Sequence, residues 1–163
     1  MPLMPKMRKL IFPIGQSGST ICAGCQLKAK NLFLKGEGMS NKNEKTVLVA
    51  EDDDAIRSVL KEMLQELGYN AIFARNGEEA LLLAKKYEGS LHILLADVVM
   101  PGINGCELAE RLSHMRPDIK VILMSGYPKT AHPEVETTKA VFVQKPFTIN
   151  QLAIKLEEAL KEH

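Results

Sequence analysis

The stretch that decides the fold is His92-Ile-Leu-Leu-Ala-Asp-Val-Val-Met-Pro-Gly-Ile-Asn-Gly105. Its apolar residues 93–96 lead directly into Asp97, and a set of turn residues follows: Pro101, Gly102, Asn104 and Gly105. A short apolar run bounded by proline and glycine is typical of a fully buried strand. Asp97 therefore lies at the carboxyl end of a predicted central strand, where open α/β folds form their ligand crevice. Taken alone, Asp97 could equally be a turn or capping residue.

Four further apolar segments have the same character, at residues 47–50, 71–74, 121–124 and 141–144. Between these segments, apolar residues recur at helical spacing. The clearest stripe ends at Gly68 and consists of Ile56, Val59, Leu60, Met63, Leu64 and Leu67. Asn76 and Thr148 are predicted helix N-caps, and Pro133 suits the first turn of a short fourth helix. Five strands alternating with five helices predict an α/β fold whose parallel sheet is covered on both faces.

Charge divides the chain into two parts. Residues 1–45 hold eight lysines or arginines against two glutamates, a net charge of +6, whereas residues 46–163 carry a net charge of −5. We therefore predict a basic extension or linker at 1–45, largely disordered, and a globular domain at 46–163. No apolar run approaches the roughly 18 residues that span a bilayer, so we expect no membrane segment and a cytoplasmic protein.

The cysteines predict no disulfide framework. Cys22 and Cys25 have the spacing of a metal or redox pair, but no second pair follows and residues 1–45 contain no histidine. A structural zinc site needs four ligands, so we favour no role for this pair. Cys106 is interpreted as a small apolar residue of a helix.

The ends of four of the predicted strands carry acidic, hydroxyl and ammonium groups that could act together. Glu51 and Asp52 follow the first strand, Asp97 the third, Ser125 the fourth and Lys145 the fifth. Right-handed crossovers place the carboxyl ends of parallel strands at one edge of the sheet, so these groups are expected to share one crevice. Each has a structural explanation when taken singly, as a cap or a turn residue. Their joint occurrence at four strand ends favours a functional site.

Carboxylates this close together repel one another unless a cation neutralises them. Mg²⁺ prefers oxygen ligands, and Asp52, Asp97 and a backbone carbonyl near Val99 could hold it. Lys145 would balance the remaining charge, and Ser125 could donate a hydrogen bond to another oxygen. A metal beside a carboxylate nucleophile is typical of phosphoryl transfer, and Asp97 is the best candidate for that nucleophile.

These residues resemble the response-regulator receiver domain of two-component signalling. The matching segments, Val47-Leu-Val-Ala-Glu-Asp-Asp53, Asp97-Val-Val-Met-Pro-Gly-Ile-Asn-Gly105, Leu123-Met-Ser-Gly126 and Gln144-Lys-Pro-Phe147, cover the globular part and none of residues 1–45. The amino-acid sequences of the last two segments look most like those of receivers attached to hybrid histidine kinases. The resemblance implies a doubly wound, flavodoxin-like sheet with strand order 2-1-3-4-5 and five helices.

The resemblance also implies a role for each matching position. Asp97 would be the phosphoacceptor, with Asp52 a direct magnesium ligand and Glu51 acting largely through water. Lys145 would contact the phosphoryl group. Two further positions match the switch residues of the family: the hydroxyl of Ser125 and the aromatic ring of Phe142.

The implied donor is a phosphohistidine on a partner histidine kinase or phosphotransfer protein, and phosphorylation would change a protein-interaction face formed by the fourth helix, fifth strand and fifth helix. Only Lys161-Glu-His163 follows the last predicted helix, so we expect no output domain and no direct nucleic-acid binding. The downstream partner and homodimer formation stay open. Two alternatives are a receiver-like interaction module that is never phosphorylated and a small Mg²⁺-dependent phosphatase, although no Asp-x-Asp nucleophile motif accompanies Asp97.

At Val99 the sequence departs from the pattern of the receiver family, and this departure has a chemical consequence. It is apolar and lies two residues after Asp97, so its side chain cannot orient a hydrolytic water by hydrogen bonding. We therefore predict a comparatively long-lived acyl phosphate.

Overall fold

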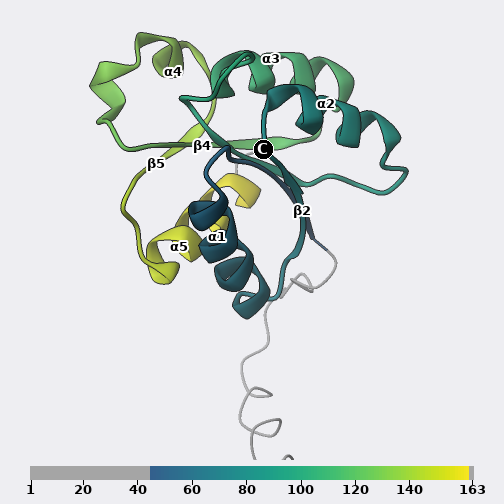
Figure 1. Cartoon of the computed structure of the whole chain (residues 1–163), viewed down its shortest axis with the longest axis horizontal. Coiled ribbons are helices and arrows are strands. Elements are labelled where there is room, and N and C mark those ends of the chain that lie inside the picture. The colour runs from purple at the N-terminus through teal and green to yellow at the C-terminus, as the bar shows by residue number, and fades with distance from the viewer. Residues whose placement is uncertain (1–44, 162–163) are drawn as a thin grey trace, which may run out of the picture. The chain divides into compact units, whose positions relative to one another are not determined.

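The computed structural model describes residues 45–161, in which a five-stranded sheet lies between two layers of helices (Figure 1). The strands are β1 (Thr46–Ala50), β2 (Asn70–Ala74), β3 (Ile93–Asp97), β4 (Lys120–Ser125) and β5 (Val141–Gln144). All neighbouring pairs are parallel, and their order is β2-β1-β3-β4-β5. The predicted doubly wound α/β fold and its strand order are confirmed.

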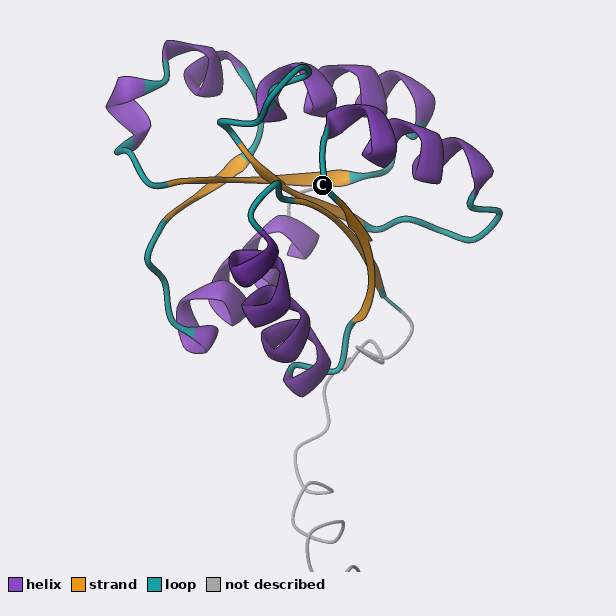
Figure 2. Ribbon diagram, viewed as in Figure 1, coloured by secondary structure: helices purple, strands orange, loops and turns teal. Residues whose placement is uncertain are grey.

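Helices cover both faces of the sheet, as Figure 2 shows by colour. One face carries α1 (Asp54–Glu66) and α5 (Ile149–Lys161), whose inward residues form one apolar cluster with the sheet. The opposite face carries α2 (Gly77–Lys86), α3 (Gly105–Met115) and α4 (Pro133–Thr137), which contribute to the other cluster. A 3₁₀ turn, η2 (Lys129–Ala131), precedes α4.

Between their ends the central strands are apolar, because both of their faces are buried. Successive side chains of a strand point to opposite faces. In β3, Ile93 and Leu95 pack with α1 and α5, whereas Leu94 and Ala96 pack with the helices of the other face. All four of these side chains are fully buried. The continuous apolar run before Asp97 is thus explained by two cores that share one strand.

The predicted boundaries at Asn76, Thr148 and Gly68 are confirmed by local geometry, whereas α2 ends at Lys86, before Gly89. The Asn76 side chain accepts from the backbone N–H of Glu79 and caps α2. Thr148 and Gln151 form a reciprocal capping box before α5, in which the Gln151 N–H donates to Thr148 Oγ1 at 3.3 Å and the Thr148 N–H donates to Gln151 Oε1 at 2.8 Å. Gly68 follows α1 with a φ of 78°, as a C′ residue would.

Helix α1 departs from the predicted stripe at one position. Leu60 and Leu64 are buried, but the Val59 side chain is 50% exposed. An apolar residue beside a helical stripe is not required to reach the core, and single exposed apolar side chains are common on protein surfaces. The stripe on α1 is therefore narrower than predicted.

The fourth helix is short, as predicted, with five residues and Pro133 in its first turn. Its buried anchor is Val135, which joins the cluster formed with α2 and α3. An open cavity of about 1080 Å³ lies between α3 and α4, with walls that include Glu110, Val121 and Glu134.

Two expectations fall wholly or partly outside the described residues. The predicted basic extension at 1–45, with Cys22 and Cys25, lies there apart from Lys45. Over residues 45–161, no helix is both long and apolar enough to cross a membrane. Cys106 is buried in α3, which fits its interpretation as a small apolar residue.

His92 gives the fold a dependence on pH. Its Nδ1 atom accepts a hydrogen bond of 3.0 Å from the backbone N–H of Thr46. Burial, together with the positive charge of Lys45, holds the pKa of His92 below its ordinary value of 6.5. The stability conferred by the neutral ring is therefore complete above pH 6.5 and is lost as the pH falls through the lower pKa of the folded state.

In His92→Asn, Oδ1 can accept the same hydrogen bond without titrating, so we expect a flatter dependence of unfolding free energy on pH. Urea unfolding over a pH series measures this, and equal slopes for the two proteins would contradict it.

Gly105 is required where α3 begins. A Cβ atom at this position would lie 2.2 Å from the backbone oxygen of Asp97, which is too close for any side chain. We expect Gly105→Ala to lower the unfolding free energy by about 1–3 kcal/mol, because the strand end or the helix must shift. Gly126→Ala is the matched control, since a Cβ there meets nothing within 4 Å. Urea unfolding of both variants tests this, and equal stabilities would show that the loop relaxes without cost.

Candidate functional site

The end of β1 delivers two acidic side chains to the carboxyl edge of the sheet. Glu51 is only 1% exposed, and its Oε1 atom accepts a hydrogen bond of 3.3 Å from the backbone N–H of Asp53. Asp52 is exposed to solvent. Asp53 turns away to cap α1, where it accepts from the N–H groups of Ala55 and Ile56. The first two acids thus face the crevice, and the third starts the helix.

Asp97 lies at the end of β3, between the ends of its two neighbours. Its Oδ1 atom accepts a hydrogen bond of 3.0 Å from the backbone N–H of Val99, which turns the chain away from the strand. Its Oδ2 atom accepts a hydrogen bond of 2.6 Å from the ammonium group of Lys145. The side chain is 13% exposed, so the carboxylate is accessible without being solvated on all sides.

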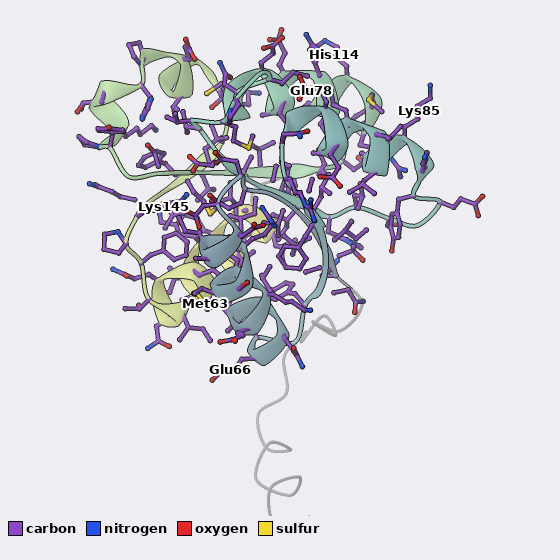
Figure 3. All side chains as sticks on the ribbon, in the orientation of Figure 1. Met63, Glu66, Glu78, Lys85, His114 and Lys145 are labelled. Carbon is purple, nitrogen blue, oxygen red and sulfur yellow. The ribbon has the colours of Figure 1, made fainter. Side chains whose placement is uncertain are left out.

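Lys145 follows β5 and connects the acidic groups. Its Nζ atom lies 2.7 Å from Glu51 Oε2 and 2.6 Å from Asp97 Oδ2, so one ammonium group bridges two carboxylates that are distant in sequence. Its contacts place the Lys145 side chain at the carboxyl edge of the sheet, whereas Glu66 and Lys85, also labelled in Figure 3, extend from the outer surfaces of their helices. The Lys145–Pro146 peptide bond is cis.

Burial and charge oppose each other in this bridge. Burial raises the pKa of the Glu51 carboxyl above its ordinary value, although Lys145 partly offsets the effect. Burial alone would lower the pKa of Lys145, but its hydrogen bonds to Asp97 and Glu51 outweigh this and raise that pKa above its ordinary value. The ammonium group therefore stays charged, and it is the counter-charge that the two carboxylates need.

The acidic cluster fits a divalent cation. One carboxylate oxygen from each of Glu51, Asp52 and Asp97 lies within 4.8 Å of the others. Hard cations such as Mg²⁺ are bound by oxygen ligands of this kind, commonly with several waters. The donor set thus agrees with the predicted metal, while the contribution of the Val99 carbonyl stays a prediction.

The two predicted switch residues, Ser125 and Phe142, lie on β4 and β5. Ser125 ends β4 and is fully buried, and its backbone oxygen accepts a hydrogen bond of 2.7 Å from the N–H of Lys145. Its hydroxyl, however, is engaged elsewhere, with Nε2 of His132 at 2.8 Å and the N–H of Tyr127 at 3.1 Å. Phe142 is half-buried on β5 and packs against the apolar cluster that the sheet forms with α2, α3 and α4.

Sequence patterns missed two residues that contact this region. Arg57 donates from Nη1 to the backbone oxygens of Glu51 at 2.7 Å and Asp52 at 3.3 Å, and it pairs with Asp54, so it ties the acidic turn to α1. Its position one turn after the Asp53 cap was the available signal. His132 contacts Ser125 from a loop without periodicity, and no sequence pattern indicated that contact.

Comparison with known proteins supports the same family. A model of the response regulator receiver domain matches residues 47–157. The sensor kinase CckA of Brucella abortus (strain 2308) is 39% identical over 119 residues, which cover 72% of this chain and 13% of that kinase. The response regulator receiver protein CpdR of the same organism is 33% identical over 118 residues, covering 71% of this chain and 97% of CpdR.

A solved structure gives the same result in three dimensions. The response regulator TrrA of Thermotoga maritima, crystallised in complex with Mg(2+)-BeF, superimposes with a TM-score of 0.61 and 36% identity, over 71% of this chain and 99% of that one. The strand order, the acidic strand ends and the family model agree. The chain belongs to the response regulator receiver family of two-component signalling.

Proposed function

We propose that this chain accepts a phosphoryl group on Asp97 from a phosphohistidine of a partner histidine kinase or phosphotransfer protein. The observation that carries the proposal is the bridge from Lys145 Nζ to Glu51 and Asp97, at 2.7 and 2.6 Å, beside the exposed Asp52. In the transfer, the phosphorus–nitrogen bond of the donor breaks and a phosphorus–oxygen bond to the Asp97 carboxylate forms. The histidine leaves with its electron pair.

The residues around Asp97 would assist by position and charge. Glu51, Asp52 and Asp97 would hold Mg²⁺, which when bound neutralises negative charge on the carboxylates and the phosphoryl group. Lys145 already donates to Asp97, so its ammonium group lies within reach of an oxygen added to that carboxylate. The chain assists a reaction on its own side chain and, in this proposal, has no external substrate to turn over.

The output of the reaction would be a shift between two conformations. Ser125 would move to donate to a phosphoryl oxygen, and the half-buried Phe142 would turn further inward. Both residues lie next to the face formed by α4, β5 and α5, so that face would change shape and affinity for a protein partner. Such a change is a shift of population between states that both exist beforehand. Cytoplasmic location and the absence of direct nucleic-acid binding stay predictions, and the downstream partner and homodimer formation stay open.

The proposal predicts modification at one residue. Incubation of the whole chain with acetyl phosphate and Mg²⁺ is expected to add one phosphoryl group, measured by intact mass, and Asp97→Asn is expected to abolish it. Asp118→Asn, at an exposed aspartate between α3 and β4, is the matched control and should be modified like the wild type.

Other results would favour the alternatives. No modification with any donor would support an interaction module that is never phosphorylated. Turnover of a generic phosphomonoester, lost in Asp97→Asn, would support a phosphatase.

Val99 predicts the lifetime of the phosphorylated form. Its side chain is 56% exposed beside Asp97, where a hydrolytic water would have to approach. Val99→Asn would supply a hydrogen bond to that water. A net contribution of about 1 kcal/mol corresponds to a loss of phosphoryl group roughly fivefold faster. The measurement is the decay of intact mass after the donor is removed, with Val99→Leu as the apolar control. Decay of Val99→Asn no faster than that of Val99→Leu would contradict the prediction.

A further inference from the structure

The hydroxyl group of Ser125 is fully buried and has two neighbours. The backbone N–H of Tyr127 donates to Ser125 Oγ at 3.1 Å, and Nε2 of His132 lies 2.8 Å from the same oxygen. A backbone amide can only donate, so one lone pair of the hydroxyl oxygen is used by Tyr127. The hydroxyl group has a single proton of its own to donate.

Burial decides the direction of the second hydrogen bond. A hydroxyl proton enclosed without an acceptor carries a desolvation penalty, so buried hydroxyl groups donate where they can. Among the described residues, His132 Nε2 is the one acceptor within hydrogen-bond distance of Ser125 Oγ. The network therefore assigns Ser125 as the donor and His132 as the acceptor. Because Nε2 accepts, the neutral ring carries its proton on Nδ1.

The His132 ring is held in place from several sides. It meets the ring of Tyr127 edge to face, at a centroid distance of 6.2 Å and an angle of 70°. Its backbone N–H donates to Lys129 O at 3.0 Å, and its backbone oxygen accepts from the N–H of Val135 at 3.0 Å. His132 directly precedes Pro133, which narrows the backbone conformations open to it, and it has φ −125° and ψ 81°. The backbone of His132 is thus held by the junction of η2 and α4, and its ring contacts Ser125 and Tyr127.

We propose that His132 is a positioning residue that holds the Ser125 hydroxyl in the unphosphorylated arrangement, by competing with the phosphoryl group for its one proton. This inference rests on the proposed function. Ser125 can donate to Nε2 of His132 or to a phosphoryl oxygen on Asp97, but not to both. On phosphorylation the Ser125 hydroxyl exchanges one acceptor for the other, and the strength of its hydrogen bond to His132 sets how readily Ser125 moves. A chain that lacks this acceptor favours the switched state.

The test measures the affinity of beryllofluoride, with Mg²⁺, as a phosphoryl mimic for the whole chain. His132→Phe keeps a flat ring beside Tyr127 but accepts no hydrogen bond, and it is expected to bind roughly fivefold more tightly, as for the loss of one competing hydrogen bond. His132→Gln offers Oε1 as an acceptor and is expected to bind like the wild type. In a Ser125→Ala background, His132→Phe is expected to change nothing, which separates a positioning effect from a general change in stability.

Each other result overturns a specific statement. Equal affinities of wild type and His132→Phe, or an effect that persists in Ser125→Ala, would overturn the role of His132 and leave the proposed function standing. No binding by the wild type would overturn the proposed function and this inference with it.

A second measurement needs no variant. Nitrogen–proton correlation spectra of the His132 ring in alkaline buffer are expected to show the proton on Nδ1, and a proton on Nε2 would overturn the proposal.

Discussion

The ammonium group of Lys145 lies between two carboxylates that follow or end different strands, and the Lys145 side chain is only 14% exposed. Glu51 is almost wholly enclosed, and a buried carboxylate without a partner is strongly unfavourable. The bridge is possible only because β1 and β3 are neighbours and the chain after β5 reaches back to them. The site's electrostatics and the sheet's topology therefore depend on each other.

The two helical layers serve this arrangement by burying the sheet on both sides. Side chains of β3 alternate between two apolar clusters, so the strand that ends in Asp97 is fixed from both faces. Fixed strand ends keep the acidic oxygens close together, and Arg57 adds a restraint by holding the carbonyl oxygens of Glu51 and Asp52. The charged groups of the site are thus positioned before any ligand binds, which lowers the cost of ordering them later.

Much of this arrangement could be predicted from the sequence, because it follows from periodicity and chain order. The strands, the caps at Asn76 and Thr148 and the short helix at Pro133 each have a local signal, and the grouping of Asp97 with Lys145 follows from parallel strand ends. Val59 shows the limit, since a helical stripe gives the direction of a face but not its width. The contact of His132 with Ser125 depends on the path of an irregular loop, and no repeat in the sequence encodes that path.

The strand register has a consequence for how such a chain can vary over evolutionary time. Residues 47–50 pair in register with 93–96, and alternate side chains enter different cores. Apolar exchanges within these strands leave the alternation intact. The loss or gain of one residue reverses this alternation and sends side chains that fit one cluster into the other. It also shifts Asp97 along the strand, away from Lys145 and the acidic residues that follow β1. Length in the strands is therefore under a stricter constraint than side-chain identity, and changes in length are expected to accumulate in the connections at the opposite edge of the sheet.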